Sequence, residues 1–172
     1  MGEQNGTHIR LADADSAEDV GQIVEIARQW PAQFVPDAMD AIEGDLHRFP
    51  CFVLVRENII HAFLIVIPTS LELELLWAAA RKSAYRRSHY MRLLFLAAEK
   101  EYFHGNPRCL LAYAKMAAPD ASIPDAPEFQ GNASAPMRKL LTQLGYKPEY
   151  RLESYWKTRD HCILIIKRKT ET

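Results

Sequence analysis

The strongest constraint on the fold of this 172-residue chain is a strand–helix–strand unit in the middle of the sequence. Residues 71–80 and 108–114 are apolar runs that predict two strands. Between them, apolar side chains recur at helical spacing from Tyr90 to Tyr102, and Gly105-Asn106-Pro107 ends the helix. Two strands joined by a helix in this way require a parallel crossover connection.

The N-terminal part predicts one strand and two helices. Residues 8–12 alternate between polar and apolar side chains, as a strand does. Ser16 with Asp19 resembles a capping box, and Pro31 stops the helix that follows. Pro36 suits the first turn of a second helix.

Two further regions predict a hairpin and a closing pair of strands. Residues 51–55 and 59–67 are apolar, β-branched runs around Arg56-Glu57-Asn58, which is typical of a β-hairpin. Residues 116–134 contain three prolines and many small residues, and they predict a long loop. The last predicted elements are a short helix at residues 136–144 and strands at residues 146–156 and 162–168.

The predicted element order is βααβββαβαββ, with no internal repeat and no domain boundary. The strands around the parallel crossover can pair as antiparallel hairpins. We therefore expect one α+β domain over residues 1–172. Its sheet is mixed, mostly antiparallel and twisted, with about seven strands and helices on both faces.

Composition excludes several classes of protein. The formal net charge of −1 gives no overall attraction to nucleic acid or to an acidic membrane. The longest apolar run, residues 62–68, is too short to cross a bilayer, and the polar N-terminus shows no secretory signal. Three widely spaced cysteines indicate reduced thiols of a cytoplasmic protein, and no metal-binding spacing occurs.

The element order and three local sequences resemble the GNAT acyltransferases. Residues 74–80, the basic turn and the Leu/Ala-rich helix look like the fourth strand, phosphate loop and third helix of that family. Leu144-Gly145-Tyr146 looks like the end of its fourth helix, and residues 155–168 look like its closing hairpin. The resemblance implies an N-acyltransferase. It would move an acyl group, with acetyl expected, from acyl-CoA to an amine of a small molecule or peptide.

The resemblance also implies a coenzyme A site at the start of the third helix. The family pattern there is Arg/Gln-x-x-Gly-x-Gly/Ala, and in residues 86–91 Arg86 fits the first position. His89 and Met91 occupy the two positions of small residues. Arg81, Lys82 and three further arginines form a basic cluster that can hold phosphate, although a solvated basic loop is the alternative interpretation. The implied cofactor-binding residues are Ala78, Ala79, Ala80, Arg81, Arg86, Arg87, Ser88, His89, Tyr90, Met91, Arg92 and Ser134.

Acyl transfer to an amine needs a base and benefits from a proton donor for the leaving thiolate. The resemblance implies that Glu74 or Glu72 is the base. Their spacing places them on one face of a strand, where a polar outer face is the alternative explanation. The family's tyrosine acid corresponds to Leu141, which cannot donate a proton. Tyr155 or Tyr113 are the candidates to replace it, unless each is only a packed aromatic residue.

Three alternatives remain open at this point. A degenerate GNAT-like domain would bind or regulate without catalysis, because the small loop residues and the tyrosine are missing. An enzyme that uses coenzyme A with an acceptor other than an amine is a weaker interpretation. Phe95 and Leu96 are surplus apolar residues of the third helix, which points to a homodimer surface. Trp30 and Phe34 are candidates to line the acceptor pocket, or they pack in the core.

Overall fold

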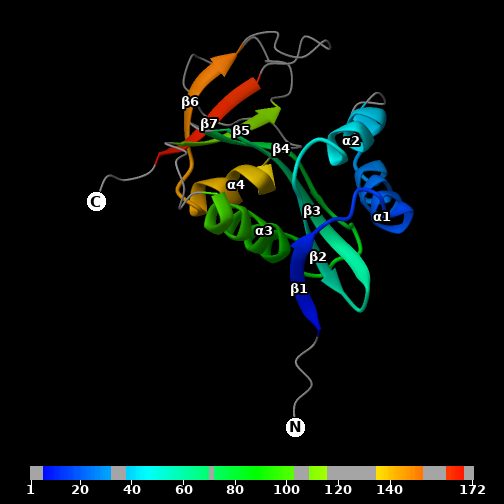
Figure 1. Cartoon of the computed structure of the whole chain (residues 1–172). Coiled ribbons are helices and arrows are strands. Elements are labelled where there is room, and N and C mark those ends of the chain that lie inside the picture. The colour runs from blue at the N-terminus through cyan, green and yellow to red at the C-terminus, as the bar shows by residue number, and fades with distance from the viewer. Residues whose placement is uncertain are drawn as a thin grey trace.

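A computed structural model describes residues 6–31, 38–69, 72–102, 109–115, 135–152 and 162–168 (Figure 1). The predicted element order is confirmed. The elements are β1 (Thr7–Leu11), α1 (Ala17–Arg28), α2 (Ala38–Leu46), β2 (Cys51–Arg56), β3 (Ile59–Pro68), β4 (Glu72–Ala80), α3 (Arg87–Tyr102), β5 (Cys109–Lys115), α4 (Ala135–Gln143), β6 (Lys147–Leu152) and β7 (Cys162–Arg168).

The strands of the described residues form one sheet in the order β1-β2-β3-β4-β5-β7-β6. Only β4 and β5 pair in parallel, as the crossover required, and the other neighbours within this part of the chain are antiparallel. The predicted α+β class with a mixed, mostly antiparallel sheet is confirmed. The last two strands exchange places, so that β7 lies between β5 and β6.

The β2–β3 hairpin turns where the sequence indicated. Glu57 and Asn58 have φ angles of 53° and 62°, which is the left-handed conformation of a two-residue type I′ turn. Asn tolerates this conformation better than most residues because its side chain can bond locally. Arg56 pairs with Ile59 across the turn, and this pairing sets the register of the hairpin.

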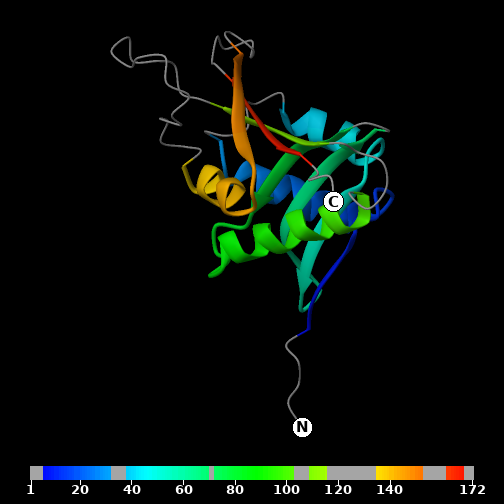
Figure 2. The same cartoon turned by 90° about the vertical axis from the view of Figure 1, so that its left-hand side faces the viewer.

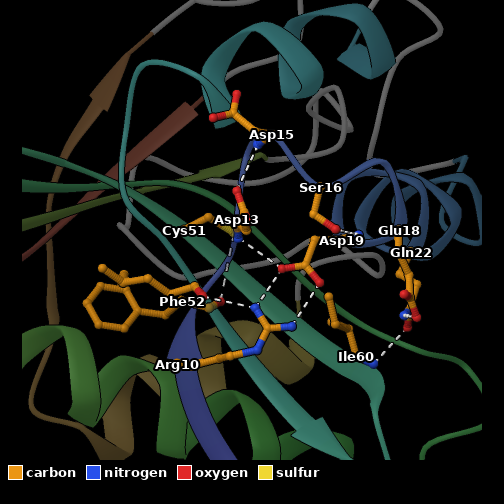
Figure 3. Close-up of polar contacts among 11 residues, drawn as sticks. Arg10, Asp13, Asp15, Ser16, Glu18, Asp19, Gln22, Cys51, Phe52 and Ile60 are labelled. Carbon is orange, nitrogen blue, oxygen red and sulfur yellow. Dashed lines mark hydrogen bonds and ion pairs between the residues drawn. The ribbon is translucent and has the colours of Figure 1, made fainter.

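Helix α1 begins at a side-chain cap. The Ser16 hydroxyl accepts a hydrogen bond from the Asp19 backbone N–H at 3.3 Å, which confirms half of the expected capping box. The Asp19 carboxylate does not return to the cap. Instead it accepts two bonds from the Arg10 guanidinium, at 2.6 and 2.8 Å, and one from the Asp13 N–H (Figure 3). This ion pair fixes α1 against β1.

The sheet separates two apolar cores. Figure 2 shows α3 and α4 in front of the strands and α1 and α2 behind them. Side chains of β2, β3 and β4 alternate between the two faces, because successive residues of a strand point in opposite directions. On the α3 side the largest buried members include Leu64, Leu73, Leu94 and Tyr146, and on the α1 side they include Ile23, Ile42, Phe63 and Ile65.

Some expectations change at the level of single residues. The sequence predicted that the third helix begins near Tyr90, after a basic connection that includes Arg87 and Ser88. In the structure Arg87 and Ser88 already form the first turn of α3. Phe95 is only 2% exposed and packs edge-on against Tyr146, so its proposed place in a partner surface is wrong. Cys51 is a buried free thiol, and burial raises its pKa to about 12. The predicted loop at residues 116–134 lies outside the described residues.

Candidate active site

Strands β4 and β5 part after a short stretch of pairing. Four residue pairs join them, from Glu72 with Cys109 to Leu75 with Ala112. Beyond this point β4 continues to Ala80 beside β3, and β5 continues to Lys115 beside β7. Within the described residues, β4 therefore has no strand partner on its β5 side from Leu76 onward.

A β-bulge lies where the two strands separate. On β3, Val66 pairs with Leu75 and Ile65 pairs with Trp77, so that Leu76 is an extra residue of β4. The bulge moves the following side chains to the opposite face: Leu75 belongs to the core under α3, whereas Trp77 packs on the α1 side. Bulges often mark sites where a strand bends away from its partner.

The two glutamates lie on one face of β4, as their spacing predicted, and that face is the one opposite to α3. They alternate with Leu73 and Leu75, which are buried on the α3 side. Glu72 is exposed at the start of the strand, whereas Glu74 is half-buried next to the point of separation. Burial, together with the charge of Glu72, raises the pKa of Glu74. A raised pKa gives the Glu74 carboxylate more affinity for a proton than a glutamate in water has.

The N-terminus of α3 forms the second part of the site. The Tyr90 N–H bonds to the Arg86 carbonyl at 2.9 Å, which leaves the N–H groups of Arg87, Ser88 and His89 without a partner inside the helix. An arginine at the cap offers no acceptor, and the first turn contains no acidic residue. Arg86, Arg87, Ser88, His89 and Arg92 are all exposed. The donors and charges at this end suit an anion.

Met91 and His89, the two large residues at the positions of small residues in the family pattern, differ in burial. Met91 is 5% exposed and belongs to the core between α3 and the sheet, together with Tyr90. It therefore points away from the exposed end of the helix. His89 is exposed in the first turn, and its ring lies 6.4 Å from the ring of Tyr90. Of these two large side chains, only His89 is exposed in the first turn, where the N–H groups have no partner inside the helix.

Solved structures share this fold over nearly the whole chain. A protein of the GNAT family from Desulfovibrio desulfuricans has a TM-score of 0.74 at 14% identity, covering 95% of this chain and 99% of that one. The chain has the GNAT fold. An aminoglycoside 6′-N-acetyltransferase complexed with coenzyme A gives a TM-score of 0.74 at 16% identity, covering 94% and 96%. The ribosomal-protein-S18-alanine N-acetyltransferase of Escherichia coli gives 0.69 at 16% identity, covering 96% of each chain.

No family model and no curated protein matches the sequence. Identities of this size show the GNAT fold rather than an activity. Among the helices that the structure describes, none is long and apolar enough to cross a membrane. In the same ranges of the chain, no group of three His, Cys, Asp or Glu residues is placed to bind a metal ion.

Arg81 does not join the exposed basic residues at the start of α3. Its guanidinium bonds to the Glu25 carboxylate at 2.8 Å and to the Ile60 carbonyl at 2.7 Å, and its side chain is only 12% exposed. The bond lowers the pKa of Glu25. Arg81 thus ties the end of β4 to α1 and β3. Of the cofactor-binding candidates at the end of β4, Ala78 is partly buried, and Ala79 and Ala80 are buried.

The tyrosine candidates remain predictions. Tyr155 and Ser134 lie outside the described residues, and the side chain of Tyr113 is not described either. Leu141, at the position of the GNAT tyrosine, is 3% exposed in the core under α3 and cannot be a proton donor. Tyr146 is not a replacement: its hydroxyl donates to the Glu99 carboxylate at 3.1 Å, and burial raises its pKa.

Two features of the site gave no signal in the sequence. The bulge at Leu76 lies in a continuous apolar run, where no period marks an extra residue. The end of α1 also contacts the loop between β4 and α3: the side chain of Gln29, the C-cap residue of α1, accepts a bond from the Lys82 N–H at 2.8 Å. These two residues are far apart in the sequence, and only the folded chain brings them together. Phe34, the other predicted neighbour of the acceptor pocket, lies outside the described residues.

Proposed function

We propose that this chain is an acyl-CoA-dependent N-acyltransferase in which Glu74 is the base. The observation that carries the proposal is the opening between β4 and β5, because a half-buried carboxylate with a raised pKa lies at its start. The names of the similar structures include acetyltransferases of a small molecule and of a protein, which supports an amine acceptor of either kind. A cytoplasmic location is part of the proposal.

The residues present fit the phosphates of acyl-CoA. The free N–H groups at the start of α3 and the exposed cations around them, without any acid in the first turn, are the chemistry that binds a polyphosphate. In this proposal Arg86, Arg87, Ser88, His89 and Arg92 hold the phosphates. Near Ala78, Ala79 and Ala80, β4 has no strand partner on its β5 side among the described residues, and in this proposal a backbone N–H of this stretch donates to the thioester carbonyl and stabilises negative charge on its oxygen.

Glu74 removes the proton that the acceptor amine must lose. The neutral nitrogen then forms a bond to the acyl carbon, and the bond from that carbon to sulfur breaks. The proton that the nitrogen gives up as it becomes an amide passes to the sulfur, directly or through water, and coenzyme A leaves as a thiol. A carboxylate buried beside Glu72 accepts a proton more readily than one in water, because both burial and the neighbouring charge disfavour its ionised form.

The test is to incubate the protein with acetyl-CoA and a panel of amines and to measure turnover as the release of free thiol. Glu74→Gln should lower kcat/KM by about a hundredfold, because it keeps the shape and removes the base. In the native protein kcat/KM should rise with pH as Glu74 loses its proton, at a pH above that of an ordinary glutamate, about 4.3.

Glu72→Gln is the matched control for this substitution. Removing the charge of Glu72 should shift the rise of the pH profile to lower pH and leave the rise itself present, since Glu72 helps to raise the pKa of Glu74. Equal turnover in Glu74→Gln and the native protein, with the same pH profile, would show that Glu74 is not the base.

A second candidate function is a binding or regulatory module without catalysis. Leu141 favours a function without catalysis, because it is buried and the resemblance to GNAT acyltransferases matches it to the tyrosine acid of that family. Binding of acetyl-CoA by calorimetry, without release of thiol for any amine or other acceptor in the panel, would establish this function.

A homodimer is a further proposal. It is supported by Leu96 on α3, an apolar side chain that is 40% exposed and therefore available to a second copy of the chain.

A further inference from the structure

Trp30 makes contacts with three successive segments of the chain. It follows α1, and its indole N–H donates to the Ala80 carbonyl at 2.8 Å, at the last residue of β4. The Lys82 ammonium lies 5.1 Å from the centroid of its ring, and the Arg87 guanidinium carbon lies 5.6 Å from it. One side chain therefore contacts the end of the strand, the loop and the start of α3.

The loop between β4 and α3 is also held through its backbone. The Lys82 N–H donates to the Gln29 side chain at 2.8 Å, next to Trp30 in sequence. The Arg81 N–H donates to the His61 carbonyl at 2.8 Å, and Ala84 of the loop itself is buried. The position of the loop is thus fixed by α1 and β3, and not by the loop alone.

An aromatic ring holds a cation without cancelling its charge. A carboxylate would neutralise the cation, as Glu25 does for Arg81. The face of an indole attracts a cation through its quadrupole and adds no net charge. Among the described residues no carboxylate pairs with Lys82 or Arg87, so neither charge is balanced by an ion pair, and the indole brings together Lys82 of the loop and Arg87 of the first turn of α3.

We propose that Trp30 is a positioning residue for phosphate binding, which holds Lys82 and Arg87 beside the N-terminus of α3. This inference rests on the proposed function, in which a polyphosphate binds at that end of the helix. The exposed His89 side chain keeps an anion from approaching the backbone as closely as at a glycine. Two long cationic side chains reach an anion at a greater distance, and Trp30 reduces the entropy that they lose on binding it.

Calorimetry with inorganic pyrophosphate and with coenzyme A tests the role of Trp30. Trp30→Leu should raise the Kd for both probes about tenfold, because it releases both cations. Trp30→Phe keeps an aromatic face and loses the bond to Ala80, so it should raise the Kd less. With acetyl-CoA and an amine, Trp30→Leu should raise the KM for acetyl-CoA and retain kcat, which a loss of general stability would not do.

Phe49→Leu is the matched control, because the Arg48 guanidinium carbon lies 5.0 Å from the Phe49 ring in the turn after α2. It removes an aromatic partner of a cation elsewhere and should leave both Kd values within about twofold. The double variant Lys82→Met with Arg87→Met, at two exposed positions, should match the loss in Trp30→Leu. It provides the test if Trp30→Leu does not fold.

The results separate this inference from the proposed function. If the native protein and these variants bind both probes equally, the inference is wrong, and thiol release by the native protein would still establish the transferase. If binding depends on Trp30 but no acceptor yields thiol, the inference stands and the proposed transferase activity is wrong. If the native protein binds neither probe, both are wrong.

Discussion

At the scale of single residues, the ion pair between Arg10 and Asp19 joins β1 to α1. The Arg10 bond lowers the pKa of Asp19, and Asp19 in turn raises the pKa of Arg10. Asp19 is 8% exposed and Arg10 is 39% exposed, so water screens one partner more than the other. The carboxylate also accepts the Asp13 N–H, which completes its bonding at the entry to the helix.

We expect Asp19→Asn to lower the free energy of unfolding by about 2 kcal/mol at pH 7, because hydrogen bonds to a charged group are lost. A lowered folded pKa stabilises the protein above the unfolded pKa, about 3.9 for Asp, and this stability is lost as pH falls through the folded pKa. The difference between native and variant should therefore shrink below about pH 4. Urea unfolding at several pH values measures it.

Glu18→Gln is the control for this substitution, since Glu18 is an exposed acid in the same turn of α1. It should change the free energy of unfolding by less than about 0.5 kcal/mol. A constant difference between native protein and Asp19→Asn from pH 7 to pH 3 would contradict the assigned role of the ion pair.

Single residues also show the limit of reading the sequence. The spacing of Glu72 and Glu74 was enough to place both on one face of a strand. It contained nothing about their different burial, which depends on where β5 leaves β4 and on the cover from the α1 side. The sequence therefore predicted two candidates for the base, and the burial of Glu74 in the folded chain is the reason why we propose it for this role.

At the scale of elements, α4 ends in a backbone geometry that needs glycine. Gly145 has a φ of +88°. Its N–H bonds to the Thr142 carbonyl at 3.0 Å and the Tyr146 N–H bonds to the Leu141 carbonyl at 2.9 Å, which is the Schellman pattern. This motif directs the chain from α4 into β6 and places Tyr146 in the core.

Gly145→Ala should lower the free energy of unfolding by about 1 kcal/mol, because a Cβ disfavours the left-handed conformation. The added carbon would meet Lys167 Cε at 3.8 Å, an ordinary contact, so the cost is conformational. Gly21→Ala is the matched control: the position is helical and has nothing within 4 Å of an added Cβ, so stability should rise. Chemical denaturation measures both, and effects of the same sign would contradict this account.

The period of apolar residues predicted most helices and strands, because each element buries one face in a core and its buried residues therefore recur at fixed intervals. The apolar spacing from Tyr90 to Tyr102 identified α3, and the turn Glu57–Asn58 identified the β2–β3 hairpin. The bulge at Leu76 was not predicted, because an apolar residue fits either face of a strand that is covered on both sides.

At the scale of the whole molecule, the sheet consists of two halves that share only a short junction. Strands β1 to β4 form one half and β5, β7 and β6 form the other, and four residue pairs join β4 to β5. A second connection runs from α3. The Glu99 carboxylate accepts bonds from Lys167 Nζ on β7 at 2.8 Å and from the Tyr146 hydroxyl at 3.1 Å.

Glu99→Gln should lower the free energy of unfolding by about 2 kcal/mol, because Lys167 would remain largely buried without its carboxylate. We also expect faster hydrogen exchange of the β7 amides, since α3 would hold the second half of the sheet less firmly. Glu101→Gln on the exposed side of α3 is the control. Equal effects of the two substitutions would show that the ion pair does not connect the halves.

The sequence by itself determined the element order, the parallel crossover and the hairpin turn, because these depend on local period and on backbone preference. It also determined that the start of α3 is basic and has no acidic residue in its first turn. Only the tertiary structure decided that Arg81 is engaged by Glu25, that Met91 lies in the core, and that Trp30 contacts Lys82 and Arg87. These contacts join segments far apart in the chain, and they exist only once α1 packs beside the end of β4.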